Sequence, residues 1–96
     1  MTTQELLNYL RDRAPQYQWG VEPEGDIVKA HITDTVEMLV FSYYDSINER
    51  HTSGVDILDK NQKDSILFSQ VVLDPTPIGK PISDALTYLF LKKVGV

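Results

Sequence analysis

Two apolar runs in the middle of the chain, residues 36–44 and 65–73, constrain the fold most strongly, because each places large side chains on both faces of a predicted strand. Successive side chains of a strand point to opposite faces. The first run therefore has two apolar sets: Val36, Met38, Val40 and Tyr44 on one face, and Leu39, Phe41 and Tyr43 on the other. A strand that is apolar on both faces needs a cover on each. Only the two ends of the chain offer helices, so we expect one sheet face to be closed by another molecule.

The N-terminal segment has the pattern of an amphipathic helix. Thr2 followed three residues later by Glu5 has the form of a capping box, in which each side chain bonds to the backbone N–H group of the other residue. The helix is expected to run to about Arg13, because Pro15 disfavours helical conformation in the residue before it. Its apolar residues fall on one arc and predict a one-sided cover: Leu6, Leu7, Leu10 and Ala14.

A second helix is predicted near the C-terminus, from Ile82 or Ser83 to about Lys93. Polar residues near its start and lysines near its end suit the helix dipole. Its main apolar stripe comprises Ile82, Ala85, Leu86, Leu89 and Phe90. Tyr88 and Leu91 lie off this stripe. These two side chains would face water if the helix covered only its own sheet.

Three shorter segments are also predicted to be strands: residues 17–21, 26–33 and 55–59. Polar or proline-rich segments connect the strands: a tight turn at 34–35, a long hairpin loop at 45–54, a second loop at 60–64 and an extended linker at 74–81. The order of these elements predicts an α+β fold. It consists of an N-terminal helix, a meander of four or five mostly antiparallel strands, and a C-terminal helix, in a single small domain over residues 1–96.

Length and charge argue against several classes of function. A chain of 96 residues with a net charge of −5 is expected to fold around one small core and rarely hosts a deep pocket. Between Glu22 and Asp74 there are 11 acidic and 4 basic side chains, a net charge of −7. A nucleic-acid binder shows the reverse pattern, a basic stripe that neutralises phosphates. We therefore expect no direct binding to nucleic acid.

The cellular setting is predicted from what the sequence omits. It contains no cysteine, which removes disulfides and thiolate catalysis and is typical of a reducing compartment, so we expect a cytoplasmic protein. The N-terminus does not read as basic residues followed by an apolar stretch, the pattern of an export signal. No apolar run approaches the ~18 residues of a membrane span, so no membrane association is expected.

Candidate catalytic and metal-binding groups are few, and each has a more ordinary interpretation. His31 with Asp34 is the minimal general-base pair, but a solvated strand position explains this histidine better because no nucleophile is near it in sequence. The carboxylates within 56–64 lack the ligand spacing of a calcium loop. We predict no catalytic residue, no metal and no cofactor. The single tryptophan, Trp19, is compatible with a core or an interface role.

We expect the chain to act by association rather than by chemistry. The first hypothesis is a non-enzymatic, acidic interaction or regulatory domain, such as an inhibitor, that binds another protein. Its build is similar to that of small acidic inhibitors of the phage or immunity type, an analogy of build alone. The second hypothesis is a homodimeric or larger assembly module, and the third a small ligand-binding domain or enzyme. The residues expected to contact a partner are Leu39, Phe41, Tyr43, Glu49, Arg50, His51, Tyr88 and Leu91.

Overall fold

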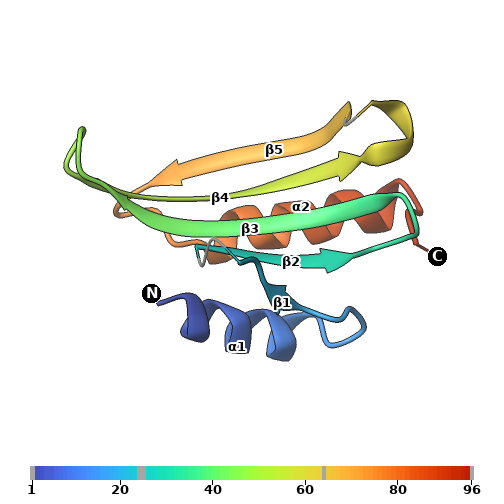
Figure 1. The fold of residues 1–96 in the computed structure, drawn as a ribbon, viewed down its shortest axis with the longest axis horizontal. Helices are drawn as coiled ribbons and strands as arrows, with labels where there is room; N and C mark the ends of the chain where they lie inside the picture. Colours follow the sequence, from blue (N-terminus) through green and yellow to red (C-terminus); the bar gives the residue numbers. More distant parts are fainter. Residues whose placement is uncertain (1, 24–25, 64, 96) are drawn as a thin grey trace.

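The computed structural model describes residues 2–23, 26–63 and 65–95. Its elements, in chain order, are α1 (Thr3–Arg13), β1 (Gly20–Val21), β2 (Ile27–His31), β3 (Val36–Asp45), β4 (Arg50–Asp59), the short 3₁₀ helix η1 (Lys60–Gln62), β5 (Ser65–Leu73) and α2 (Gly79–Leu91). The five strands form one antiparallel sheet in the order β1-β2-β3-β4-β5, so each strand pairs with its neighbour in sequence (Figure 1). The predicted α+β meander between two helices is confirmed.

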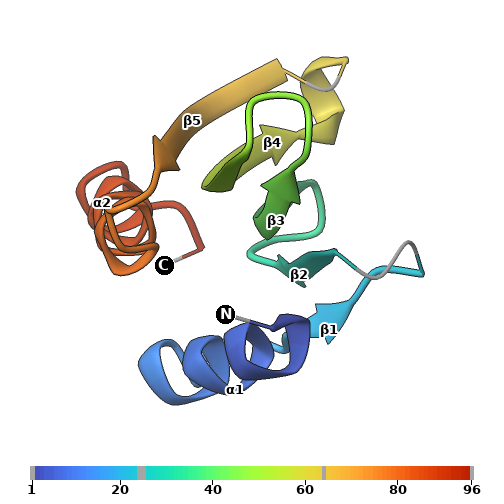
Figure 2. The same cartoon turned by 90° about the vertical axis from the view of Figure 1, so that its left-hand side faces the viewer.

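Both helices lie on the same side of the sheet. α1 packs against β1 and β2, and α2 packs against β4 and β5, so the middle of the sheet is enclosed between them (Figure 2). The buried side chains of both helices join those of the strands in one cluster. We call this side of the sheet the core face and the other side the open face. On the strands, the core face is lined by residues at most 6% exposed: Val28, Ala30, Val36, Met38, Val40, Val55 and Ile57.

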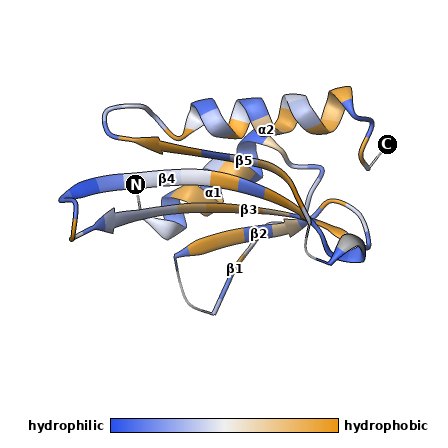
Figure 3. Cartoon of the chain, turned by 90° about the horizontal axis from the view of Figure 1, so that it is seen from above, coloured by the Kyte–Doolittle hydropathy of each residue, from blue (hydrophilic) through white to orange (hydrophobic). Residues whose placement is uncertain are grey.

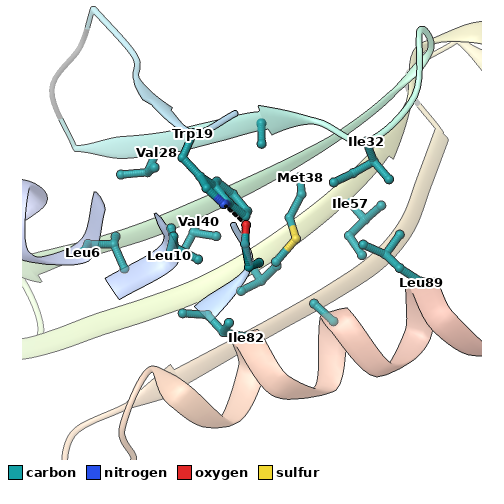
Figure 4. Close-up of a cluster of buried hydrophobic side chains, with 14 of the residues drawn as sticks. Leu6, Leu10, Trp19, Val28, Ile32, Met38, Val40, Ile57, Ile82 and Leu89 are labelled. Carbon is teal, nitrogen blue, oxygen red and sulfur yellow. Dashed lines mark hydrogen bonds between the residues drawn. The ribbon is translucent and has the colours of Figure 1, made fainter. Parts of the chain in front are cut away.

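The N-terminal helix has the predicted cap and the predicted end. The N–H group of Glu5 donates a hydrogen bond to the hydroxyl of Thr2 at 3.1 Å, and the N–H group of Thr2 donates to Oε1 of Glu5 at 3.0 Å. After the helix, the indole N–H of Trp19 donates to the carbonyl oxygen of Ala14 at 3.0 Å (Figure 4). Because Trp19 is 5% exposed and its polar atom is satisfied, it is a core residue.

The loop between β3 and β4 is shorter than the sequence predicts. The polar segment 45–54 has the composition of a long loop, but only 46–49 lie between the two strands. Residues 50–54 instead extend β4, where Thr52 and Ser53 are buried. Composition is a weak guide here, because cross-strand pairing and ladder hydrogen bonds hold polar residues in a strand as well as apolar ones.

The C-terminal helix begins earlier than the sequence predicts, at Gly79 instead of Ile82 or Ser83. Pro81 lies in the first turn of α2. In that turn a backbone N–H has no partner within the helix, so a proline is tolerated there. The predicted linker at 74–81 is therefore shorter by its last three residues, and the helix ends at Leu91.

Candidate protein-interaction surface

The open face of the sheet carries an apolar patch. Paired residues of neighbouring antiparallel strands point to the same face, so the register defines rows of side chains across the sheet. Two adjacent rows are rich in apolar residues: Ile27, Phe41, Gly54 and Val71 in one, and Tyr43, Thr52 and Leu73 in the other. We define the apolar patch as the five large side chains Leu39, Phe41, Tyr43, Val71 and Leu73.

The aromatic part of the patch is held in place by contacts within the sheet. The ring of Phe41 lies over Gly54, because a Cβ atom added to this glycine would come within 2.5 Å of Cζ of Phe41. A glycine in a strand often marks such a close approach, and an aromatic ring covers the backbone it leaves bare. The rings of Phe41 and Tyr43 follow each other along β3, with centroids 6.0 Å apart, a separation typical of favourable aromatic pairs.

The patch remains accessible. Tyr43 is 42% exposed, Val71 55% and Leu73 40%, while Leu39 and Phe41 are half-buried. The structure thus places Leu39, Phe41 and Tyr43 together on the face that the helices leave uncovered, and their binding role stays a prediction. Val71 and Leu73 were missed, although the alternation of apolar residues in 65–73 is the signal that could have found them.

A charged cluster borders the patch on the open face. The carboxylate of Glu37 contacts Nζ of Lys60. It also lies 3.7 Å from Nζ of Lys29 and 3.8 Å from Nδ1 of His31. Nζ of Lys29 in turn contacts the carboxylate of Glu22 at 2.5 Å. Glu37 is 3% exposed. Burial raises the pKa of its carboxyl group, but the neighbouring Lys60, Lys29 and His31 outweigh burial and hold the pKa below its ordinary value. We call these five residues the Glu37 cluster.

A polar hollow borders the patch at the β3–β4 hairpin. Its volume is about 420 Å³, and it is lined by Asp45, Asn48, Arg50, Thr52 and Leu73. Arg50 is exposed and lies opposite Asp45 in the register, so this predicted contact residue extends the open face. Glu49 precedes it in the turn with a φ of 53°, the left-handed region, and its side chain is exposed.

His51 points to the other side of the sheet, because it is the strand neighbour of Arg50. Its Nε2 atom lies 2.6 Å from Oγ of Ser42, and the hydroxyl of Ser53 donates to that same oxygen at 3.2 Å. A serine bonded to a histidine is part of a nucleophile–base arrangement. Among the described residues, however, no carboxylate forms an ion pair with His51. These three side chains form a polar network that links β3 to β4.

The predicted contact residues of α2 form a third region, away from the open face. Tyr88 is half-buried, and the centroid of its ring lies 5.6 Å from that of Phe68 on β5. Leu91 is 69% exposed at the end of the helix. Phe90, which the predicted stripe places in the core, is 75% exposed, so that prediction is wrong. It lines an open groove of about 810 Å³ between residues 16–18 and the end of α2.

Two of the carboxylates set aside as metal-binding candidates have local partners. Asp56 accepts a hydrogen bond from the hydroxyl of Ser69 at 2.7 Å, and Asp59 accepts one from a backbone N–H at 2.9 Å, while Asp64 lies outside the described residues. In the described ranges 2–23, 26–63 and 65–95, no group of three or more potential ligands is placed to hold a metal ion. No helix in these ranges is long and apolar enough to cross a membrane.

Comparison of the chain with protein-family models, with curated proteins and with solved structures found no match in any of the three. The open face is therefore the feature from which a function can be inferred, because it combines five apolar side chains with a polar border on two sides.

Proposed function

We propose that the chain is a non-enzymatic interaction domain that binds another protein through the open face of its sheet. The observation that carries this proposal is the apolar patch, which stays partly exposed while both helices cover the core face. Large contiguous apolar surfaces are rare on monomeric proteins and usually mark binding sites. A regulatory or inhibitory domain of this kind acts by occupying its target, so it needs no catalytic group.

The composition of the open face supports a protein as the ligand. Its centre is apolar and aromatic, whereas its borders are the Glu37 cluster and the polar hollow around Arg50. Protein interfaces have an apolar centre surrounded by polar groups, and tyrosine is frequent among the residues that dominate binding. Small molecules prefer concave sites that enclose them. A sheet face such as this one suits a protein surface better.

The charge of the chain indicates what kind of protein would bind. The chain carries a net charge of −5, and the block that contains the sheet carries −7 between Glu22 and Asp74. Complementary charge speeds the encounter of two proteins and suppresses wrong partners. We therefore expect a partner protein with a net positive charge, whose binding weakens as salt concentration rises.

Two adjacent tyrosines provide a matched test. Tyr43 and Tyr44 are both exposed, at 42% and 61%, but they point to opposite faces of β3. Wild type, Tyr43→Ser and Tyr44→Ser would each be used to capture proteins from extracts of the native host, with identification by mass spectrometry. We expect a protein that wild type and Tyr44→Ser retain and Tyr43→Ser loses. With the purified partner, Tyr43→Ser should bind at least about tenfold more weakly in calorimetry.

Circular dichroism must show that both variants keep the fold, because the test compares binding and not stability. The proposal is contradicted if no captured protein distinguishes Tyr43→Ser from Tyr44→Ser. It is also contradicted if a specific partner is lost equally by both variants, since that result would place the contact away from the open face.

A further inference from the structure

The two edges of the sheet are built differently. β5 is the last strand in the order β1-β2-β3-β4-β5, so within the described part of the chain only β4 pairs with it, and it is the outermost strand at the top of Figure 1. The outer N–H and C=O groups of such a strand have no ladder partner and can pair with another strand. At the opposite edge, β1 has two residues, and α1 packs against it. α2 packs against the core face of β5, but among the described residues no strand pairs with its outer edge. One edge of the sheet is therefore short, and the other is long and unpaired.

β5 lacks the features that usually protect an open edge. Natural edge strands are short or carry charged residues, lysine above all, or proline. β5 has nine residues and contains neither a charged residue nor a proline, and Figure 3 shows hydrophobic colour over both of its ends. A register shift near Ile57 and Leu58 leaves Leu67 without a pair, but residues 68–73 keep regular register. This straight stretch is free to form a second ladder.

We propose that β5 pairs with β5 of a second copy of this chain, antiparallel and about a two-fold axis perpendicular to the sheet. Two sheets of five strands then join into one sheet of ten strands, and the open faces of the two copies become continuous. This contact uses the strand edge and not the centre of the apolar patch. It therefore goes beyond the proposed binding of another protein and does not depend on it.

The absence of charge in β5 favours a second copy over a strand of another protein. Each chain carries a net charge of −5, yet pairing β5 with itself brings no charged side chain of the ladder against a like charge. An uncharged edge also offers no ion pair that would select a basic strand. Two-fold antiparallel pairing opposes residues of the same face. If the pair is centred on residue 71, Val71 lies opposite Val71 of the other copy, and if it is centred on residue 70, the two valines are diagonal neighbours ~8 Å apart.

The size of the contact sets the expected affinity. A strand of nine residues spans about 30 Å, and pairing two such edges buries less surface than the ~1,600 Å² of a standard interface. We therefore expect a weak dimer, with a Kd in the micromolar range. Salt should tighten this dimer, because it screens the repulsion between two negative chains. The binding of a basic partner should respond to salt in the opposite direction.

The first experiment measures the oligomeric state of the pure protein. Sedimentation from about 5 to about 500 μM should show a monomer–dimer equilibrium by mass action, shifted towards the dimer at higher salt. Hydrogen–deuterium exchange over the same range should show amide protection that grows in β5 and stays constant in β1. A protein that remains monomeric over the whole range at both salt concentrations would overturn the proposal.

The second experiment introduces a charge of either sign next to the two-fold axis. Val71 is 55% exposed, so Val71→Lys and Val71→Glu should both keep the fold, as circular dichroism can check. Each variant alone should dimerise at least about tenfold more weakly, because like charges meet across the ladder, and an equal mixture of the two should regain the dimer. Tyr43→Lys, on the same face but two strands away, is the control and should dimerise as wild type does.

The two proposals fail in different ways. If the Val71 variants dimerise like wild type, or if their mixture does not recover, the dimer is not formed by β5 edges. If Tyr43→Lys loses the dimer as well, the contact lies on the face of the sheet and not at its edge. A loss of the captured partner by Tyr43→Ser with an unchanged dimer would support both proposals.

Discussion

The core face and the open face of the sheet are built from alternate residues of the same strands, yet the side chains buried on the two faces differ in kind. Along β3, Met38 and Val40 face the helices and are 0% exposed. The residues beside them face the other way: Glu37 is buried and forms ion pairs, and Leu39 and Phe41 are half-buried. Aliphatic packing against two helices seals the core face, whereas burial on the open face comes from neighbouring strands and, at Glu37, also from Lys60 of η1.

This difference separates folding from binding. Loss of a side chain from a closely packed core removes many contacts and leaves a cavity. A half-exposed side chain keeps part of its contact with water in the folded state, so its truncation changes the free energy of unfolding less. Substitutions on the open face should therefore alter binding with a small effect on stability, and substitutions on the core face should do the reverse.

The largest expected difference is between the neighbours Met38 and Leu39. Met38→Ala removes a fully buried side chain and should lower the free energy of unfolding by about 3 kcal/mol. Leu39→Ala should lower it by about 1 kcal/mol, because this half-buried side chain loses less contact. Urea unfolding of both variants and wild type measures the two losses, provided that the m-values agree. Equal losses would show that the open face is as tightly sealed as the core face.

A smaller difference is expected between two strand glycines. Gly54→Ala should lower the free energy of unfolding by about 2 kcal/mol, because its methyl group would meet the ring of Phe41 at 2.5 Å and the carbonyl oxygen of Gln70 at 2.8 Å. At Gly20 no atom of the described residues lies within 4 Å of an added Cβ atom, so Gly20→Ala is the control and should change stability by less than about 0.5 kcal/mol. Thermal and urea unfolding would both report this contrast. Matching stabilities for the two variants would mean that the ring of Phe41 is not held over Gly54.

Local periodicity was sufficient to predict most of the fold. The capping box at Thr2 and the alternation within 26–33 and 36–44 depend on neighbouring residues alone, and the structure has a helix and two strands at these places. Boundaries moved where composition was the main signal. β4 begins in a polar segment at Arg50, and α2 begins before Pro81, because strand pairing and the free N–H groups of a first helical turn decide these ends.

The arrangement of the surfaces could not be predicted from local sequence patterns. Both sides of β3 are apolar, so the pattern does not say which side the helices cover. Arg50 and His51 were predicted in one loop, but as strand neighbours they point to opposite faces. The Glu37 cluster joins residues from β2, β3, η1 and the segment after β1. No local signal reveals such a cluster, because the register that assembles it spans the whole sheet.

The smallest expected effect is electrostatic and concerns Glu37. Glu37→Gln preserves the size of the side chain and removes its charge, and at pH 7 it should lower the free energy of unfolding by about 1.5 kcal/mol. The loss stays moderate because Lys60, which is 53% exposed, can be solvated when it is unpaired. Asp84→Asn is the control, since Asp84 pairs with Lys80 at 2.8 Å and its side chain is 44% exposed, although it also contacts Gln70. Its effect should be much smaller, as is usual for surface ion pairs.

The pH dependence of stability shows whether Glu37 stabilises the fold through its charge or through its shape. Burial raises the pKa of Glu37, but pairing with Lys60 and Lys29 outweighs it, so the folded-state pKa lies below the ordinary 4.5. The folded state then binds this proton less readily than the unfolded state, and the stabilisation is complete above pH 4.5 and lost as pH falls through the folded-state pKa. The stability gap between wild type and Glu37→Gln, measured by urea unfolding at a series of pH values, should therefore narrow below pH 4.5. A gap that does not narrow would mean that shape and packing hold Glu37, and the open face would then resemble the core face.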